Sequence, residues 1–207
     1  MVLEVQRPLI IACAALTADL RAVLSTDGLD SLIDVHYLPA NLHNAPHKIV
    51  GELRPLVEQA VALDRAVFVA YADCGTGGLL DLFLAEYPSI SRLPGAHCYE
   101  FFAGSALFAG LHEAELGTFY LTDFLAKHFD ALVWSGLGLD RAPQLLESYF
   151  AHYTRLVFLS QTHDSQTLAA AEQAAQRLGL AFEHRHVGRT GLAPLTDWAL
   201  TIRKAAA

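Results

Sequence analysis

Short apolar runs alternate with segments of helical spacing along the chain. The clearest run, Ala66–Ala70, is continuous and rich in β-branched and aromatic residues, which is typical of a strand buried on both faces. The segment Pro46–Leu63 has apolar residues three and four positions apart and predicts a helix. Its Pro55 requires a kink or a restart of that helix.

The same criteria predict the remaining elements. Strands are expected at Leu9–Ala12, Ile33–Leu38, Ala66–Ala70, Ser91–Leu93, Thr118–Leu121, Leu156–Ser160 and Ala181–His186. Helices are expected at Thr17–Ser25, Pro46–Leu63, Leu79–Glu86, Phe101–Leu111, Asp123–Ser135, Ala142–Tyr153, Ser165–Leu178 and Leu195–Arg203, with Thr17 and Thr122 as N-caps. This alternation predicts a Rossmann-like α/β fold, a mainly parallel sheet with helices on both faces. We expect a single domain over residues 1–207, with two small lobes and a cleft, divided near residues 112–118, as the alternative.

Composition narrows the class of protein. With 207 residues, 53% of them hydrophobic and 17% charged, the chain is able to bury about 70% of its unfolded surface and is not disordered. The net charge is −8 without a basic segment, so a nucleic-acid partner is not expected. No apolar run reaches the ~20 residues of a membrane span, and no export signal is present, which predicts a cytoplasmic protein. The apolar helices are compatible with a homodimer.

The three cysteines each lie where a predicted element gives way to a loop. Cys13 follows the first strand, Cys74 opens a glycine-rich stretch, and Cys98 stands next to His97. In an open α/β sheet, the loops at the carboxyl ends of the strands line the ligand crevice, so these residues could meet at one site. An odd number of cysteines in a chain of this size indicates free thiols.

A zinc site is the first interpretation of these thiols. Zinc binds thiolate and imidazole in tetrahedral geometry, so Cys13, Cys74 and Cys98 would be ligands, with His97 or His43 nearby. Their spacing is not that of a zinc finger, so the fold alone must bring them together. The alternative is that a free cysteine is a small buried hydrophobe, which applies best to Cys13.

Two other chemistries involve the segment that begins at Cys74. The thiol lies about one turn before a predicted helix, whose positive end would make it a better nucleophile. A pair of cysteines acting as acid and base, as in cofactor-independent racemases, needs one from each lobe, and none follows Cys98. The backbone N–H groups of Gly75, Thr76, Gly77 and Gly78 could bind a phosphate or carboxylate group of a substrate. A tight turn that uses glycine for positive φ is an equal alternative.

Further polar residues in these loops complete the expected site. Glu100, His97 and Asp73 are candidate catalytic acids or bases, although Asp73 could equally cap its loop. His43, in a proline-bounded loop, and Tyr99 are candidate substrate contacts.

Five segments together resemble a known family. They are Ile11-Ala12-Cys13, Leu38-Pro39-Ala40 with Leu42-His43-Asn44, Tyr71-Ala72-Asp73-Cys74-Gly75-Thr76-Gly77-Gly78, Gly95-Ala96-His97-Cys98-Tyr99-Glu100 and Gly136-Leu137-Gly138-Leu139-Asp140. The combination is similar to the bacterial and archaeal domain-of-unknown-function family 1638, over about Pro8 to Val187. Ala14 departs from the glycine expected after the first cysteine. The resemblance implies a cytoplasmic α/β protein with these cysteines and His97 as signature residues, encoded near corrinoid-dependent methyltransferases and folate enzymes.

These observations lead to three hypotheses. The first is a zinc-thiolate enzyme that acts on a small anionic or thiol substrate, with methyl or other one-carbon group transfer linked to corrinoid or folate metabolism, or else hydrolysis or lyase chemistry. The second is an accessory protein that binds a cofactor or metal for a methyltransferase system. The third is an inert domain with buried thiols.

Overall fold

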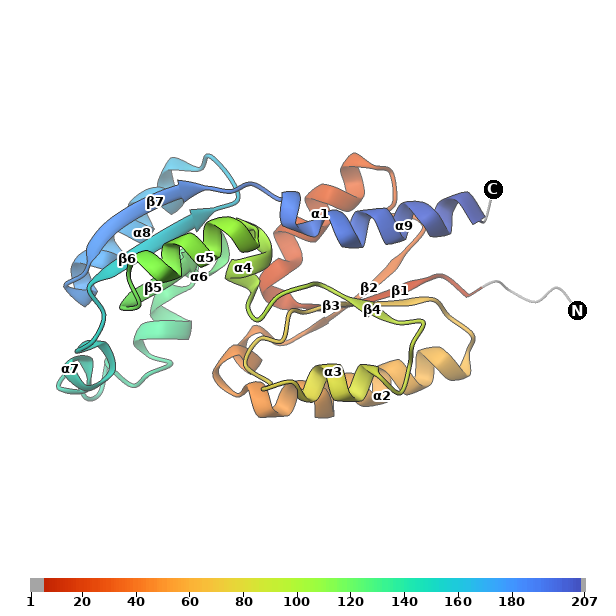
Figure 1. Ribbon diagram of the computed structural model, residues 1–207, viewed down its shortest axis with the longest axis horizontal. Helices are drawn as coiled ribbons and strands as arrows, with labels where there is room; N and C mark the ends of the chain where they lie inside the picture. Colours follow the sequence, from red (N-terminus) through yellow and green to blue (C-terminus); the bar gives the residue numbers. More distant parts are fainter. Residues whose placement is uncertain (1–5, 206–207) are drawn as a thin grey trace, which may run out of the picture. The chain divides into compact units, whose positions relative to one another are not determined.

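The chain has an α/β fold with two parallel β-sheets, each in its own compact unit (Figure 1). The computed structural model describes residues 6–205. Unit 1 holds the chain up to Phe101 together with the segment from Leu192 onward, and unit 2 holds Phe102–Gly191. No helix in the described part of the chain is both long and apolar enough to cross a membrane.

Unit 1 is built on a four-stranded sheet with the order β2-β1-β3-β4. Its strands are β1 (Leu9–Cys13), β2 (Asp34–Leu38), β3 (Val67–Ala70) and β4 (Ser91–Arg92), and every pairing is parallel. The central strands β1 and β3 consist almost wholly of buried apolar residues, as the sequence predicts. A parallel strand covered on both faces requires this composition.

Helices cover both faces of this sheet. They are α1 (Thr17–Thr26), α2 (Ile49–Ala62), α3 (Leu79–Leu84) and α9 (Ala193–Ala205), and the unit also holds the short 3₁₀ segments η1 (Ala14–Leu16), η2 (Ala40–Asn44) and η3 (Pro46–Lys48). Helix α4 (Cys98–Ala103) and the 3₁₀ segment η5 (Thr190–Leu192) include the residues at which the chain passes between the two units. Figure 1 shows α2 and α3 on one side of the sheet and α1 and α9 on the other. Ile11 and Val69 pack toward α2 and α3, whereas Phe68 faces the other way and meets Trp198 of α9 at a ring-centroid distance of 5.4 Å.

Unit 2 is built on a three-stranded parallel sheet with the order β5-β6-β7. The strands are β5 (Thr118–Thr122), β6 (Arg155–Ser160) and β7 (Ala181–His186), and the helices are α5 (Ser105–Ala114), α6 (Asp123–Lys127), a π-helix η4 (Asp130–Trp134), α7 (Leu145–Phe150) and α8 (Ser165–Leu178). Helices α6 and α8 pack against each other and against the sheet. Strand β7 is an edge strand, and most of its residues are exposed.

Most predicted elements are present, and the differences have local causes. The predicted helix Phe101–Leu111 is interrupted at Gly104, whose φ of +78° ends α4 before α5 begins. The predicted helix Asp123–Ser135 ends at Lys127 and is followed by the π-helix. Thr122 caps α6 as predicted, whereas Thr17 lies inside α1, and its hydroxyl donates to the Ala14 carbonyl. Helix α2 continues through Pro55.

Candidate functional site

Cys13 and Tyr71 meet at the carboxyl edge of the sheet of unit 1. Strand pairing matches Ile11 with Val69, so the next residues on that face of the two strands are Cys13 and Tyr71. Both belong to the apolar cluster that packs on α2 and α3. Side chains two positions apart on a strand point to the same face, so the thiol and the phenol continue the buried face of Ile11 and Val69.

The loops that carry Cys74 and Cys98 lie side by side. The Asp73 N–H donates to the Gly95 carbonyl at 3.1 Å, and the Cys74 N–H donates to the Ala96 carbonyl at 2.8 Å. The backbone of Cys98 lies near enough to the Cys74 sulfur to lower the pKa of that thiol, against the larger effect of burial. These bonds extend the contact between β3 and β4 beyond the ends of the strands, and they place the two thiols together.

The three thiols lie near enough to one another to change their ionisation. Burial raises the pKa of Cys74 to about 12, with a further increase from the nearby Cys13. Burial likewise raises the pKa of Cys98 well above its usual value, and Cys74 and Cys13 raise it further. The pKa of Cys13 is also raised by burial, against the opposing effect of the Ala15 backbone and of the nearby Tyr71 hydroxyl. All three groups are therefore neutral thiols near pH 7, and none forms a disulfide.

The Tyr71 hydroxyl points at this thiol cluster, which we define as Cys13, Cys74 and Cys98. The side chain is buried, and its oxygen has no hydrogen-bond partner at ordinary distance and angle. It is nevertheless close enough to the Cys13 sulfur for each group to affect the pKa of the other. Burial raises the pKa of Tyr71 strongly, and the Cys13 and Cys74 thiols raise it further, so it remains a neutral phenol with a free donor.

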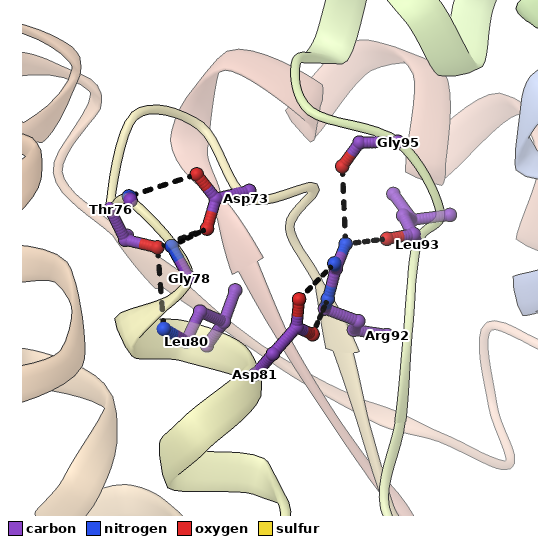
Figure 2. Close-up of polar contacts among 9 residues, drawn as sticks. Asp73, Thr76, Gly78, Leu80, Asp81, Arg92, Leu93 and Gly95 are labelled. Carbon is purple, nitrogen blue, oxygen red and sulfur yellow. Dashed lines mark hydrogen bonds and ion pairs between the residues drawn. The ribbon is translucent and has the colours of Figure 1, made fainter.

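Asp73 holds the glycine-rich loop in place by hydrogen bonds with other residues of the same loop (Figure 2). Its carboxylate accepts the Thr76 hydroxyl and the backbone N–H groups of Gly77 and Gly78 at 3.0 and 2.9 Å. These bonds lower the pKa of Asp73 against the opposing effect of burial, so it is an anion near pH 7. Two N–H groups expected to bind substrate thus have a partner inside the loop. The suggestion that Asp73 caps its loop is confirmed by these contacts.

The loop uses positive φ at four positions. Cys74 has φ of +51°, which is uncommon for a residue with a side chain, and Gly75, Gly77 and Gly78 all have positive φ. Gly75 also lies against Pro46, since a Cβ added at Gly75 would be 3.4 Å from that ring. The strained backbone at Cys74 is held by the bonds of Asp73 and by the neighbouring loop, which fixes the direction of the thiol.

Arg92, at the end of β4, connects the loop that leads to Cys98 with helix α3 (Figure 2). Its guanidinium binds both carboxylate oxygens of Asp81, at 2.6 and 2.8 Å. The same group donates to the carbonyls of Leu93 at 2.7 Å and Gly95 at 3.3 Å. Arg92 therefore positions the chain just before His97 and Cys98.

Glu100 fixes the start of α4. Its carboxylate accepts the Ala96 N–H at 2.8 Å, and a Cβ added at Gly95 would lie 2.9 Å from the same carboxylate. Gly95 has φ of +91°, so glycine is required there both for backbone conformation and for space. Glu100 thus has a structural contact beside Cys98, and its expected role as a catalytic acid or base stays a prediction.

His43 and His97 lie near each other in unit 1. His43, in η2, has its pKa lowered by loss of surrounding water and by the nearby His97. The His97 ring is 6.4 Å from that of Tyr99, measured between centroids. A lowered pKa keeps His43 neutral and able to accept a proton near pH 7.

The three thiols of the cluster are suitable ligands for a soft cation, although their side chains are not arranged as a closed metal site. Within residues 6–205, no three His, Cys, Asp or Glu side chains are placed to hold one ion as they stand. Binding by the three cysteines would therefore require their side chains to turn toward the ion. Thiolate sulfur is a preferred ligand of zinc, so the chemistry of the donors fits this metal.

The fold and these contacts define an α/β protein with a cluster of free thiols at the carboxyl edge of a parallel sheet. The sequence model of the family described as "Protein of unknown function (DUF1638)" matches residues 37–196, and the chain belongs to that family. Cys74, Cys98, His43 and His97 lie inside the matched segment, whereas Cys13 precedes it. Neither the curated proteins nor the solved structures provide a match.

Tyr71 and Arg92 are parts of this site that were not predicted from the sequence. The sequence does contain a signal for Tyr71. This residue follows Val67 and Val69 at the two-residue spacing of one strand face, directly after the strand ends. Arg92 is a lone basic residue in a short strand, and only the position of Asp81 on α3 reveals its role.

Proposed function

We propose that the thiol cluster of unit 1 binds a soft metal ion, zinc in the first instance, and that the protein is a metal-thiolate enzyme for a small thiol or anionic substrate. The observation that carries this proposal is the convergence of Cys13, Cys74 and Cys98 beside the buried, unpartnered hydroxyl of Tyr71. Three neutral thiols and a free phenol donor have little mutual attraction. A bound cation would convert the thiols to thiolates, which accept the hydrogen bond that Tyr71 is able to donate.

Three sulfur ligands would leave one zinc position for a substrate. In such a site, zinc supplies a positive charge that lowers the pKa of a substrate thiol and keeps it as a thiolate. The neutral imidazole of His43 is suited to accept the proton that such a thiol loses. His97 and Tyr99 would contact the rest of the substrate. We infer methyl or other one-carbon group transfer, connected with corrinoid or folate metabolism, as the reaction class.

The N–H groups of Gly77 and Gly78 influence which substrates fit. Because both donate to Asp73, an anionic substrate cannot use them unless Asp73 moves. A substrate that binds through sulfur is therefore favoured over one that binds through a phosphate in the glycine loop.

Metal analysis tests the proposal directly. Protein purified without added zinc, and then titrated with Zn²⁺ or Cd²⁺, should bind one ion per chain, with the ultraviolet charge-transfer band of a cadmium thiolate. Cys74→Ser and Cys98→Ser should each remove that binding, whereas His47→Gln, which changes an exposed imidazole near the loop, should not. Absence of stoichiometric binding in the folded wild-type protein would contradict the proposal.

An accessory protein is the second candidate, favoured by one observation. Asp73 and Glu100 both accept hydrogen bonds from the backbone of their own loops, so neither is a free acid or base. A protein that carries a metal or cofactor to a methyltransferase needs no such group. The carrier would release its ion to a competing chelator that mimics a partner and would consume no substrate, whereas the enzyme would show turnover. Either role requires reduced thiols, which fits the cytoplasm.

A further inference from the structure

A second group of ionisable side chains lies in unit 2, at the carboxyl ends of β6 and β7. Ser160 is the last residue of β6 and is 1% exposed. Its hydroxyl is 2.8 Å from Nε2 of His184 and 3.0 Å from Nδ1 of His186, both on the neighbouring strand β7. The pairing matches Ser160 with His186 and Phe158 with His184, so the two imidazoles stand on the same face as the hydroxyl.

A hydroxyl between two imidazole nitrogens couples their protonation. It carries one proton, so it donates to one ring and accepts from the other when both rings are neutral. If Nδ1–H of His186 donates to Ser160, the Ser160 proton is donated to Nε2 of His184. The lone pair at Nε2 of His186 is then free, and His186 is exposed to solvent.

His163 restrains the ring of His186 from the other side. The two imidazoles are stacked, with centroids 3.8 Å apart and an interplanar angle of 25°. The lone pairs of stacked rings lie in two nearly parallel planes, so the two rings are poorly arranged to bind one metal ion together. The stacking and the Ser160 bond instead hold one imidazole in a fixed orientation, which is the arrangement a catalytic base requires.

We propose that unit 2 contains an acid–base centre in which His186 exchanges a proton with a small molecule bearing an acidic O–H, N–H or S–H group. Ser160 and His184 are positioning residues: they fix the tautomer of His186 and relay the proton. The Nε2 lone pair of His186 takes the proton of the substrate. The Nδ1 proton of His186 passes to Ser160 as the Ser160 proton passes to Nε2 of His184. One proton has then left the substrate, which becomes an anion, and the positive charge rests on His184.

The charges around His184 are compatible with this relay. Partial loss of surrounding water at the exposed His184, and the neighbouring His186 and His163, lower the pKa of His184, while Asp123 and Glu172 oppose that effect. The ring is therefore neutral near pH 7 and ready to accept a proton, and two carboxylates stabilise the cation that results. Asp123 is itself held by the Gln161 N–H at 3.0 Å and the Thr162 hydroxyl at 2.5 Å, so its position is fixed.

Imidazole NMR on the ¹⁵N-labelled full chain tests the relay without knowledge of the substrate. In the wild type, long-range ¹H–¹⁵N spectra from pH 5 to pH 8.5 should show fixed tautomers for His184 and His186 and a titration in which each ring affects the other. Ser160→Ala should uncouple the two titrations and return both rings to mixed tautomers, and Ser160→Thr, which keeps a hydroxyl, should restore the coupling. Independent titration in the wild type, or identical titrations in the wild type and Ser160→Ala, would overturn the proposal.

Chemical modification tests the exposed nitrogen separately. Diethyl pyrocarbonate acylates neutral imidazole, and mass spectrometry of peptides gives a rate for each histidine. We expect His186 in the wild type to react severalfold faster at pH 7 than His152, an exposed histidine in the same unit, and Ser160→Ala to remove that difference. A His186 rate equal to or below that of His152 would refute its assignment as the proton acceptor. Amide spectra of each variant establish that it is folded.

Discussion

The Tyr71 hydroxyl and the Cys13 thiol lie close together at the carboxyl ends of β1 and β3, the two central strands of the unit 1 sheet. Tyr71 is buried and its oxygen lacks a partner at ordinary distance, yet it lies close enough to Cys13 to lower the pKa of that thiol. Leaving a buried hydroxyl unsatisfied costs about 1–3 kcal/mol, so the protein retains a group that does not stabilise it. Such a group is expected where a ligand completes the hydrogen bond.

Removing this hydroxyl should not weaken the fold. We expect Tyr71→Phe to leave the free energy of unfolding unchanged or to increase it by about 1 kcal/mol, because a buried unsatisfied oxygen is lost. The pKa of Cys13 should rise in the same variant, since the phenol no longer favours the thiolate. Urea denaturation and the pH dependence of Cys13 alkylation measure the two effects. Tyr37→Phe is the control, and a large loss of stability in Tyr71→Phe alone would show that the hydroxyl has a structural partner.

Thiol reactivity in the metal-free protein should be low at neutral pH. The thiolate is the reacting species, and the pKa of all three cysteines is raised, to about 12 for Cys74. Alkylation of Cys74 by iodoacetamide should therefore accelerate about tenfold for each pH unit between pH 7 and pH 10, without a plateau. Peptide mass spectrometry follows each site. A plateau for Cys74 below pH 9 would mean that a nearby positive charge stabilises its thiolate.

The affinity of the thiol cluster for zinc should increase with pH. Because neutral thiols must lose protons to bind zinc, affinity should increase as pH rises from 6 to 8, and binding should release protons. Calorimetry in buffers of different ionisation enthalpy counts those protons. Binding that is independent of pH would exclude the cysteines as the ligands.

Asp73 should stabilise the glycine loop mainly as an anion. We expect Asp73→Asn to destabilise the protein by about 2 kcal/mol at pH 7, because a charged acceptor of several hydrogen bonds is lost. The folded-state pKa of Asp73 is depressed, so its contribution is present above the unfolded-state pKa of about 4 and is lost as pH falls through the folded-state value. The difference between variant and wild type, measured by urea denaturation, should therefore shrink toward pH 3. A difference that stays constant would assign the effect to packing.

Gly95 and Gly77 are a matched pair of positions for testing how tightly the loop before Cys98 packs against Glu100. Both have positive φ, but a Cβ at Gly95 would meet the Glu100 carboxylate at 2.9 Å, whereas a Cβ at Gly77 would have nothing within 4 Å. Gly95→Ala should cost more stability than Gly77→Ala, by about 1 kcal/mol or more, because it adds a clash to the same backbone strain. It should also increase alkylation of Cys98, whose loop it displaces. Equal stabilities would mean that Glu100 moves away freely.

The pattern of apolar residues was sufficient to predict the class of fold. Runs such as Ala66–Ala70 are typical of strands covered on both faces, and the helix Ser165–Leu178 and the strand Ala181–His186 were predicted with the bounds observed. The break at Gly104 was missed because neighbouring apolar residues keep helical spacing across it, and only the backbone shows the positive φ. Local sequence determines periodicity, whereas a single residue of unusual φ depends on its surroundings.

Residue types and their positions along the chain were enough to identify the candidates for chemistry: three cysteines at the ends of elements, a glycine loop and a histidine beside a cysteine. Which of these residues meet depends on the tertiary structure. Parallel pairing of β1 with β3 brings Cys13 to Tyr71, and two hydrogen bonds between loops bring Cys74 to Cys98, across separations of 58 and 24 residues. Strand register and loop contacts are long-range properties, since they depend on how distant segments bury their apolar faces together, and neither is encoded in any one segment.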